Sequence, residues 1–150
     1  MAKVCPTPGF QKLLVATDNS LASKLAIDEA IKIASSCSSS LIVLSVLEVN
    51  AETEFWDPLA LEKWEMEIRK HLDGIKKRAA KSGIRCEIVV HMSDEPYREI
   101  VAEAAKKKVN TIILGSHGRT GLKRLMMGSV AQRVVGHAPC NVLIVPAKKK

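Results

Sequence analysis

Five short apolar runs, separated by segments with helical periodicity, constrain the fold more than any other feature of this sequence. The runs are rich in Val, Ile and Leu, and most are continuously apolar, as strands buried on both faces of a parallel sheet are. Their expected positions are 12–17, 41–47, 84–90, 109–114 and 140–145. The run at 84–90 alternates most between apolar and polar residues, so we expect it nearer an edge of the sheet.

The segments between these runs carry apolar residues at the spacing of amphipathic helices. Helices are predicted at about 21–37, 59–82, 94–108 and 129–137, with Asn19 or Ser20 as the N-cap of the first. This alternation predicts an α/β fold, a doubly wound five-stranded parallel sheet with helices on both faces. Ligands of such folds lie at the carboxyl ends of the strands, where the strand order reverses. The first and fourth strands are the natural neighbours across that point.

Length and composition fit one domain. The chain has 150 residues, 47% of them hydrophobic, with no evident linker or repeat, so we expect a single domain over 1–150. Residues 1–10 would be a lead-in and 147–150 a basic tail. Much of the net charge of +7 lies in the lysine runs 106–108 and 148–150, which we expect to be solvated ends. An aromatic content of 3% argues against a module that stacks nucleic-acid bases, and no specific nucleic-acid partner is predicted.

The sequence indicates a cytoplasmic protein without a membrane partner. No run reaches the roughly 18 apolar residues of a membrane helix, and the N-terminus lacks the apolar region of a signal peptide. The four cysteines and the histidines show no metal-ligand spacing, so no metal site is predicted. Reduced thiols are expected, with disulfides left open. The cysteines are Cys5, Cys37, Cys86 and Cys140.

The stretch from Gly115 to Val130 carries the clearest functional pattern, because it joins the fourth expected strand to the fourth expected helix. Glycines let a ligand approach the bare backbone, and loop N–H groups with a helix N-terminus form a site for anions. Ser129 could cap the helix or donate its hydroxyl to a phosphate oxygen. Positive charge nearby comes from Arg119, Lys123 and Arg124. The stretch therefore indicates a polyphosphate site; the alternative is a loop that needs glycines only for its turns.

The spacing in this stretch is neither that of a P-loop nor that of a Rossmann dinucleotide fingerprint. It is G-x-x-G, nine residues, then G-S, at Gly115, Gly118, Gly128 and Ser129. This resembles the ATP-binding signature of the universal stress protein family. The likeness runs from about Gln11 to Val145 and includes a first strand ending in Asp18. It implies a Rossmann-like sheet of order 3-2-1-4-5 and a homodimer formed through the fifth, edge strand.

The resemblance also implies a site for ATP, or for AMP or ADP, with Mg²⁺ accompanying a triphosphate. Three groups of residues would hold the nucleotide. At the nucleoside, Asp18 would contact the adenine or nearby groups, Val46 would meet the adenine through its backbone, and Ala16 and Thr17 would line the pocket. Those against the ribose would be Leu114 and Gly115, and those at the phosphates Gly118, Arg119, Gly128, Ser129 and Val130.

One segment departs from the family pattern. Many nucleotide-binding relatives have Gly-x-Pro where this chain has Asp94-Glu95-Pro96. A carboxylate there would weaken phosphate binding unless it points outward or holds a cation.

Three functions are compatible with these features. The first is a nucleotide-binding stress-response protein that acts as a dimeric signalling or protective module with an unidentified partner protein. The second is a slow ATPase, although the sequence has no identifiable base or paired metal-binding carboxylates. The third is a nucleotide-free dimerisation module. No catalytic residue is predicted.

Three other features have two interpretations each. Asp18 is expected as a ligand-binding residue, with a favourable position at a helix N-terminus as the alternative. His117 is expected in loop packing or in a hydrogen bond to phosphate rather than as a general base. The segment 48–58, with Phe55 and Trp56, is either a lid or partner surface, or an ordinary connection.

Overall fold

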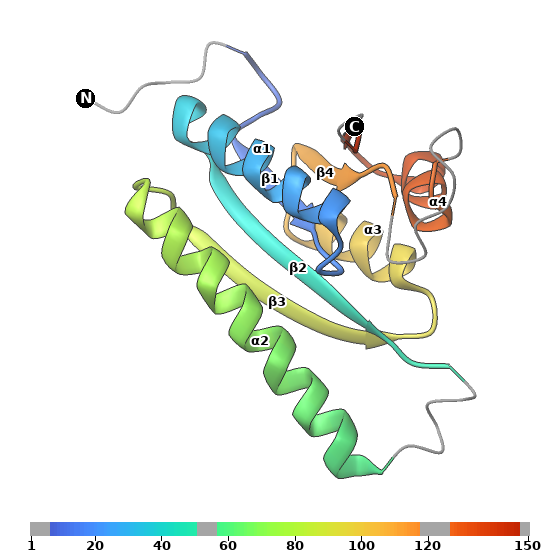
Figure 1. The fold of residues 1–150 in the computed structure, drawn as a ribbon. Helices are drawn as coiled ribbons and strands as arrows, with labels where there is room; N and C mark the ends of the chain where they lie inside the picture. The colour runs from blue at the N-terminus through green and yellow to red at the C-terminus, as the bar shows by residue number, and fades with distance from the viewer. Residues whose placement is uncertain (1–6, 51–56, 118–126, 148–150) are drawn as a thin grey trace.

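The computed structural model describes residues 7–50, 57–117 and 127–147. Strands and helices alternate along the chain, as predicted (Figure 1). The elements are β1 (Lys12–Ala16), α1 (Leu21–Cys37), β2 (Ser40–Glu48), α2 (Pro58–Lys81), β3 (Cys86–Ser93), α3 (Pro96–Lys106), β4 (Thr111–Gly115), α4 (Ser129–His137) and β5 (Asn141–Val145).

The five strands form one parallel sheet of order β3-β2-β1-β4-β5, which confirms the predicted fold. β1 lies at the centre, with Leu13 opposite Leu41 of β2 on one side and Thr111 of β4 on the other. The strand order reverses between β1 and β4, as expected. β3 and β5 are the edges, which agrees with the alternating sequence of β3.

Alternate residues of the central strands face two separate cores. Leu13 and Val15 pack with the helices α1 and α2, whereas Leu14 packs with α3 and α4. All three side chains are fully buried. Burial on both faces explains why the strand sequence is apolar without alternation.

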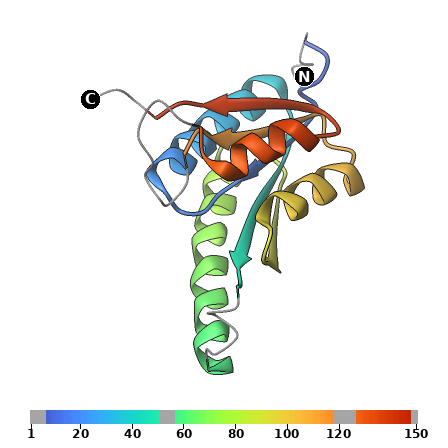
Figure 2. The same cartoon turned by 90° about the vertical axis from the view of Figure 1, so that its right-hand side faces the viewer.

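The observed bounds of β2 and β3 differ from the expected ones at the carboxyl ends. β2 continues to Glu48 and β3 to Ser93, because the two strands pair without interruption from Leu41 with Cys86 to Glu48 with Ser93. Periodicity alone did not show this, because ladder hydrogen bonds do not depend on side-chain polarity. The first turns of α2 project past the carboxyl ends of these strands (Figure 2).

The redox state of one cysteine differs from the expected one. Cys37 is disulfide-bonded, so the prediction of reduced thiols was wrong for this residue. The spacing of cysteines along a sequence gives no distance between them in the fold, and Cys5 lies outside the described residues. Cys86 and Cys140 are free thiols, and burial raises the pKa of both, which favours the unreactive protonated form.

No helix of the described residues combines the length and the apolarity that a membrane span requires.

Candidate functional site

A cavity of about 240 Å³ opens at the carboxyl ends of β1, β2 and β4, beside the point where the strand order reverses. The helices α2, α3 and α4 complete its walls with Trp64, Ile100 and Val130, among others. The predicted site residues that the structure describes all line this pocket: Ala16, Thr17, Asp18, Val46, Leu114, Gly115, Gly128, Ser129 and Val130. Gly118 and Arg119 lie outside the described residues.

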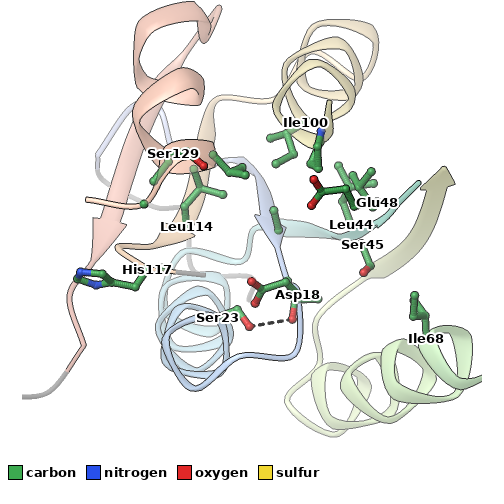
Figure 3. A pocket seen from close by; sticks show the side chains of 18 of the residues that line it. Asp18, Ser23, Leu44, Ser45, Glu48, Ile68, Ile100, Leu114, His117 and Ser129 are labelled. Atoms are coloured by element: carbon green, nitrogen blue, oxygen red, sulfur yellow. Dashed lines mark hydrogen bonds between the residues drawn. The ribbon is translucent and has the colours of Figure 1, made fainter. Parts of the chain in front are cut away.

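The turn between β1 and α1 is held by buried and partly buried hydrogen bonds. The Thr17 hydroxyl lies 3.1 Å from the Ser23 hydroxyl, drawn as a dashed line in Figure 3, and it accepts a hydrogen bond from the Asn19 N–H. Asn19 has a φ of +64°, the left-handed conformation that asparagine tolerates in tight turns. Asp18 Oδ1 accepts from the Ser20 N–H at 2.9 Å, and Figure 3 shows its carboxylate turned toward the pocket.

The start of α4 forms the opposite wall. Gly128 is the N-cap, and its N–H donates to the Ser116 carbonyl at 2.8 Å. Glycine has no side chain to accept hydrogen bonds from the first helical turn, so, as far as the described residues go, those N–H groups are left for water or a ligand. Ser129 is the first helical residue and is exposed, so the prediction that it could cap the helix was wrong. The other predicted use of its hydroxyl, a hydrogen bond to a phosphate oxygen, stays a prediction.

Gly115 has a packing role that its motif did not reveal. A Cβ atom at this position would lie 2.7 Å from the Ala22 carbonyl carbon and 2.8 Å from the Ala22 oxygen. Only glycine allows α1 to approach the end of β4 this closely. Close packing of α1, rather than a turn, therefore requires glycine at this position, which also lines the pocket.

The segment Asp94-Glu95-Pro96 places its proline, not Glu95, in the pocket wall. The Glu95 carboxylate pairs with Arg98 at 2.6 Å and with Arg133 of α4 at 3.6 Å. The Arg133 guanidinium also lies 5.3 Å from the centre of the Tyr97 ring. Two arginines thus compensate the Glu95 charge. Asp94, which stands where the family pattern has glycine, is exposed and does not line the pocket. The effect of this departure on phosphate affinity stays a prediction.

His117 is anchored through Ser116. Its Nδ1 lies 2.8 Å from the Ser116 hydroxyl, and that hydroxyl also accepts a hydrogen bond from the Ala147 N–H. The Ser116 N–H donates to the Val145 carbonyl at 3.0 Å. In Figure 3 the imidazole is directed away from Asp18, which fits a role in loop packing.

Sequence reasoning missed several residues of the pocket. Glu48, the last residue of β2, lines it, and Trp64 and Ile68 reach it from α2. An acidic residue at the end of an inner strand, as used for Asp18, was the available signal for Glu48. Contacts from α2 depend on how that helix crosses the strand ends, which the sequence does not give.

A smaller cavity of about 90 Å³ adjoins the pocket. It shares Asp18 and Trp64 with the pocket and adds His71 of α2. Burial, with a smaller contribution from the Lys24 charge, lowers the pKa of His71, so its neutral form is favoured. Within the described residues, no group of three or more His, Cys, Asp or Glu side chains is arranged to hold a metal ion.

Comparison with known proteins identifies the family: this chain belongs to the Universal stress protein family, which its residues 9–146 match. Universal stress protein MJ0531 of Methanocaldococcus jannaschii is 34% identical over 148 residues, which is 94% of this chain and 85% of that protein. The solved structure of protein MJ0577 from the same organism superimposes with a TM-score of 0.86 at 27% identity, covering 94% of this chain and 99% of that one.

Two more distant structures share the fold and were solved with adenine nucleotides. One is a universal stress protein in complex with cAMP, 24% identical, with a TM-score of 0.66 and coverage of 90% of this chain and 95% of that one. The other is the universal stress protein from Archaeoglobus fulgidus in complex with dAMP, 20% identical, with a TM-score of 0.67 and coverage of 91% and 98%.

Proposed function

We propose that this protein binds an adenine nucleotide in the pocket and acts as a nucleotide-dependent module of the stress response. The observation that carries the proposal is the polarity of the pocket. Carboxylates stand at the ends of β1 and β2, and the uncapped N-terminus of α4 stands at the other side. A ligand with hydrogen-bond donors at one end and phosphate at the other matches this arrangement.

The adenosine part would lie between apolar walls. Ala16 and Val46 at the strand ends and Ile68 of α2 offer apolar surface, and the Asp18 carboxylate supplies an acceptor. Ligand pockets are mostly apolar, with a few polar groups that fix the orientation of the ligand. Leu114 and Gly115 of β4 lie next to α4, where a ribose between base and phosphate would sit.

The phosphates would lie at the start of α4. Free N–H groups and the positive end of the helix dipole favour anions there, and the Ser129 hydroxyl adds a donor. A glycine N-cap leaves room for phosphate oxygens against the backbone. Gly118 and Arg119 remain predicted phosphate contacts.

The related structures support the ligand class. Proteins of the same fold hold cAMP and dAMP, which share an adenine base and one phosphate. We propose ATP, with AMP and ADP as alternatives. Mg²⁺ would accompany ATP, held mainly by phosphate oxygens and water.

We also propose that the protein is a cytoplasmic homodimer. β5 is an edge strand with Val142–Val145 partly exposed, and edge strands pair readily with a second chain. Bound nucleotide would then change affinity for a partner protein to the extent that it favours one conformation of the dimer. The molar mass in solution tests the dimer directly.

The test of nucleotide binding is to denature freshly purified protein and identify any released nucleotide by chromatography and mass spectrometry. We expect an adenine nucleotide near one per chain, or, if none is retained, a rise in melting temperature that saturates with ATP·Mg²⁺. Absence of both results contradicts the proposal. Phosphate release from the same sample separates a binding protein from a slow ATPase, because only the latter turns ATP over.

A further inference from the structure

We propose that the indole ring of Trp64 contacts the base of the bound nucleotide. The inference rests on the proposed nucleotide site and adds to it an aromatic wall supplied by α2. Neither the glycine signature nor the predicted site includes a residue of this helix.

Two helices that cover opposite faces of the sheet confine one part of the pocket. The apolar residues that line it from these helices are Trp64 and Ile68 of α2, and Pro96 and Ile100 of α3. Ile68 packs against the core beneath α1 and α2, whereas Ile100 belongs to the core beneath α3 and α4. Figure 3 shows these two side chains on opposite sides of the pocket. A base has two flat faces of low polarity, so it suits a space between apolar walls better than a ribose or a phosphate does.

Trp64 is the aromatic part of these walls. Among the described residues that line the pocket, it alone carries an indole or phenyl ring. It also lines the adjoining cavity of about 90 Å³, so it stands at the boundary between the two. Contact between aromatic rings is favourable in both offset-stacked and edge-to-face arrangements, and it adds to the gain from burying apolar area. Every nucleotide base can make this contact, because every base has a π-face.

The position of Trp64 along α2 supports a role toward a ligand. The first buried residue of this helix is Leu72, eight positions after Trp64. Before Leu72, α2 passes the carboxyl ends of the strands, as Figure 2 shows, so the sheet does not cover this part of the helix. Trp64 is only partly buried there. A base lying against its ring would remove apolar surface from water that the sheet leaves accessible.

The first test compares Trp64→Phe with Trp64→Leu by calorimetric titration with ATP·Mg²⁺. Both variants keep apolar bulk at this position, but only phenylalanine keeps an aromatic ring. We expect the leucine variant to bind ATP about fivefold more weakly than the phenylalanine variant, because aromatic contact adds to apolar burial. A side chain that only fills space would give both variants the same affinity.

The second test reports on direct contact. In a Trp56→Phe background Trp64 is the only tryptophan, so the fluorescence of the protein comes from this indole. Its emission should change on addition of ATP·Mg²⁺, with the same Kd that calorimetry gives. Inorganic tripolyphosphate with Mg²⁺, which has no base, should leave the emission unchanged.

The matched control is Met66→Leu, at an exposed position of α2 outside both cavities, which should keep the wild-type affinity. Equal affinities of the phenylalanine and leucine variants would overturn the inference. The same holds if Trp64 emission does not respond to ATP·Mg²⁺, or responds equally to tripolyphosphate. In these cases nucleotide binding by the wild type stands and only the role of Trp64 fails. If neither calorimetry nor thermal unfolding of the wild type responds to ATP·Mg²⁺, the proposed function fails as well.

Discussion

Two helices begin beside the pocket, and their first turns are built in opposite ways. α1 follows β1 and has a closed N-terminus: the Ser20 hydroxyl accepts a hydrogen bond from the Ser23 N–H at 3.2 Å. α4 leads away from the same edge of the sheet with Gly128 as its N-cap, so no side chain at that position can close its first turn.

The two helix starts also differ in how far their residues are buried. Ala22 is buried directly against Gly115, and Ser23 is buried in a hydrogen bond with Thr17. Ser129, by contrast, is exposed at the mouth of the pocket. A helix N-terminus binds an anion only where its N–H groups are unpaired and accessible. Within the described part of the chain, the fold thus presents two helix dipoles to one pocket and leaves the N-terminus of α4 without a side-chain cap.

The largest effect on stability should come from closing the space at Gly115. Gly115→Ala puts a Cβ atom within 3 Å of the α1 backbone, so α1 or β4 must shift. We expect a loss of about 1–3 kcal/mol in the free energy of unfolding, as for other overpacked sites. Urea unfolding measures this directly.

The control for this variant is Gly74→Ala in the middle of α2, where a Cβ atom meets nothing within 4 Å. That variant should gain up to about 1 kcal/mol, because alanine favours helix more than glycine does. Equal stability of the two variants would mean that Gly115 serves only the ligand.

The second prediction concerns Ser129 at the start of α4, where one substitution should raise the stability of the protein and lower its affinity for ATP. Ser129→Glu places a carboxylate at the open N-terminus, where it should stabilise the helix by about 0.3–1 kcal/mol. The same charge competes with phosphate, so we expect ATP affinity to fall at least about tenfold, or roughly 1.4 kcal/mol. Calorimetric titration with ATP·Mg²⁺, alongside thermal unfolding of the free protein, measures both quantities.

Ser129→Gln is the matched control, since it has nearly the same size without the charge. It should bind ATP more tightly than Ser129→Glu does. Wild-type affinity in the glutamate variant would show that the phosphates do not lie at α4.

The smallest effect should come from the closed helix start. Ser20→Ala removes the hydrogen bond to the Ser23 N–H and should cost about 1 kcal/mol of stability. ATP affinity of the folded protein should stay close to that of the wild type, whereas Ser20→Asp, which retains a cap, should leave stability nearly unchanged. A loss of ATP affinity in Ser20→Ala as large as that in Ser129→Glu would remove the distinction between the two helices.

The sequence was most informative where chemistry depends on local pattern. Continuous apolar runs gave the buried strands, and the alternating run gave the edge position of β3. Asp18 and Gly128 were found through the likeness to the universal stress protein family, supported for Asp18 by the rule that ligands of doubly wound folds lie at strand ends. Both residues line the pocket.

The sequence was least informative where two distant segments meet. The role of Gly115 depends on Ala22, which is 93 positions earlier and touches it only after β1 and β4 pair. The partners of Glu95 include Arg133, which belongs to another helix. Trp64 reaches the pocket because α2 crosses the strand ends. Such contacts depend on the angles at which helices and strands pack. Neither the periodicity nor the spacing of residues in the sequence gives those angles.

The backbone hydrogen bonds of Ser116 affect how this site could change over evolution. Its carbonyl accepts the Gly128 N–H, and its own N–H is bonded to the Val145 carbonyl at the end of β5. The chain that leaves β4 at Ser116 is therefore tied back to Ser116 where α4 begins. Changes in the length of such a closed segment cost little chain entropy, since each doubling adds only about 0.6 kcal/mol. We therefore expect changes of length between Ser116 and Gly128 to leave the start of α4 in place.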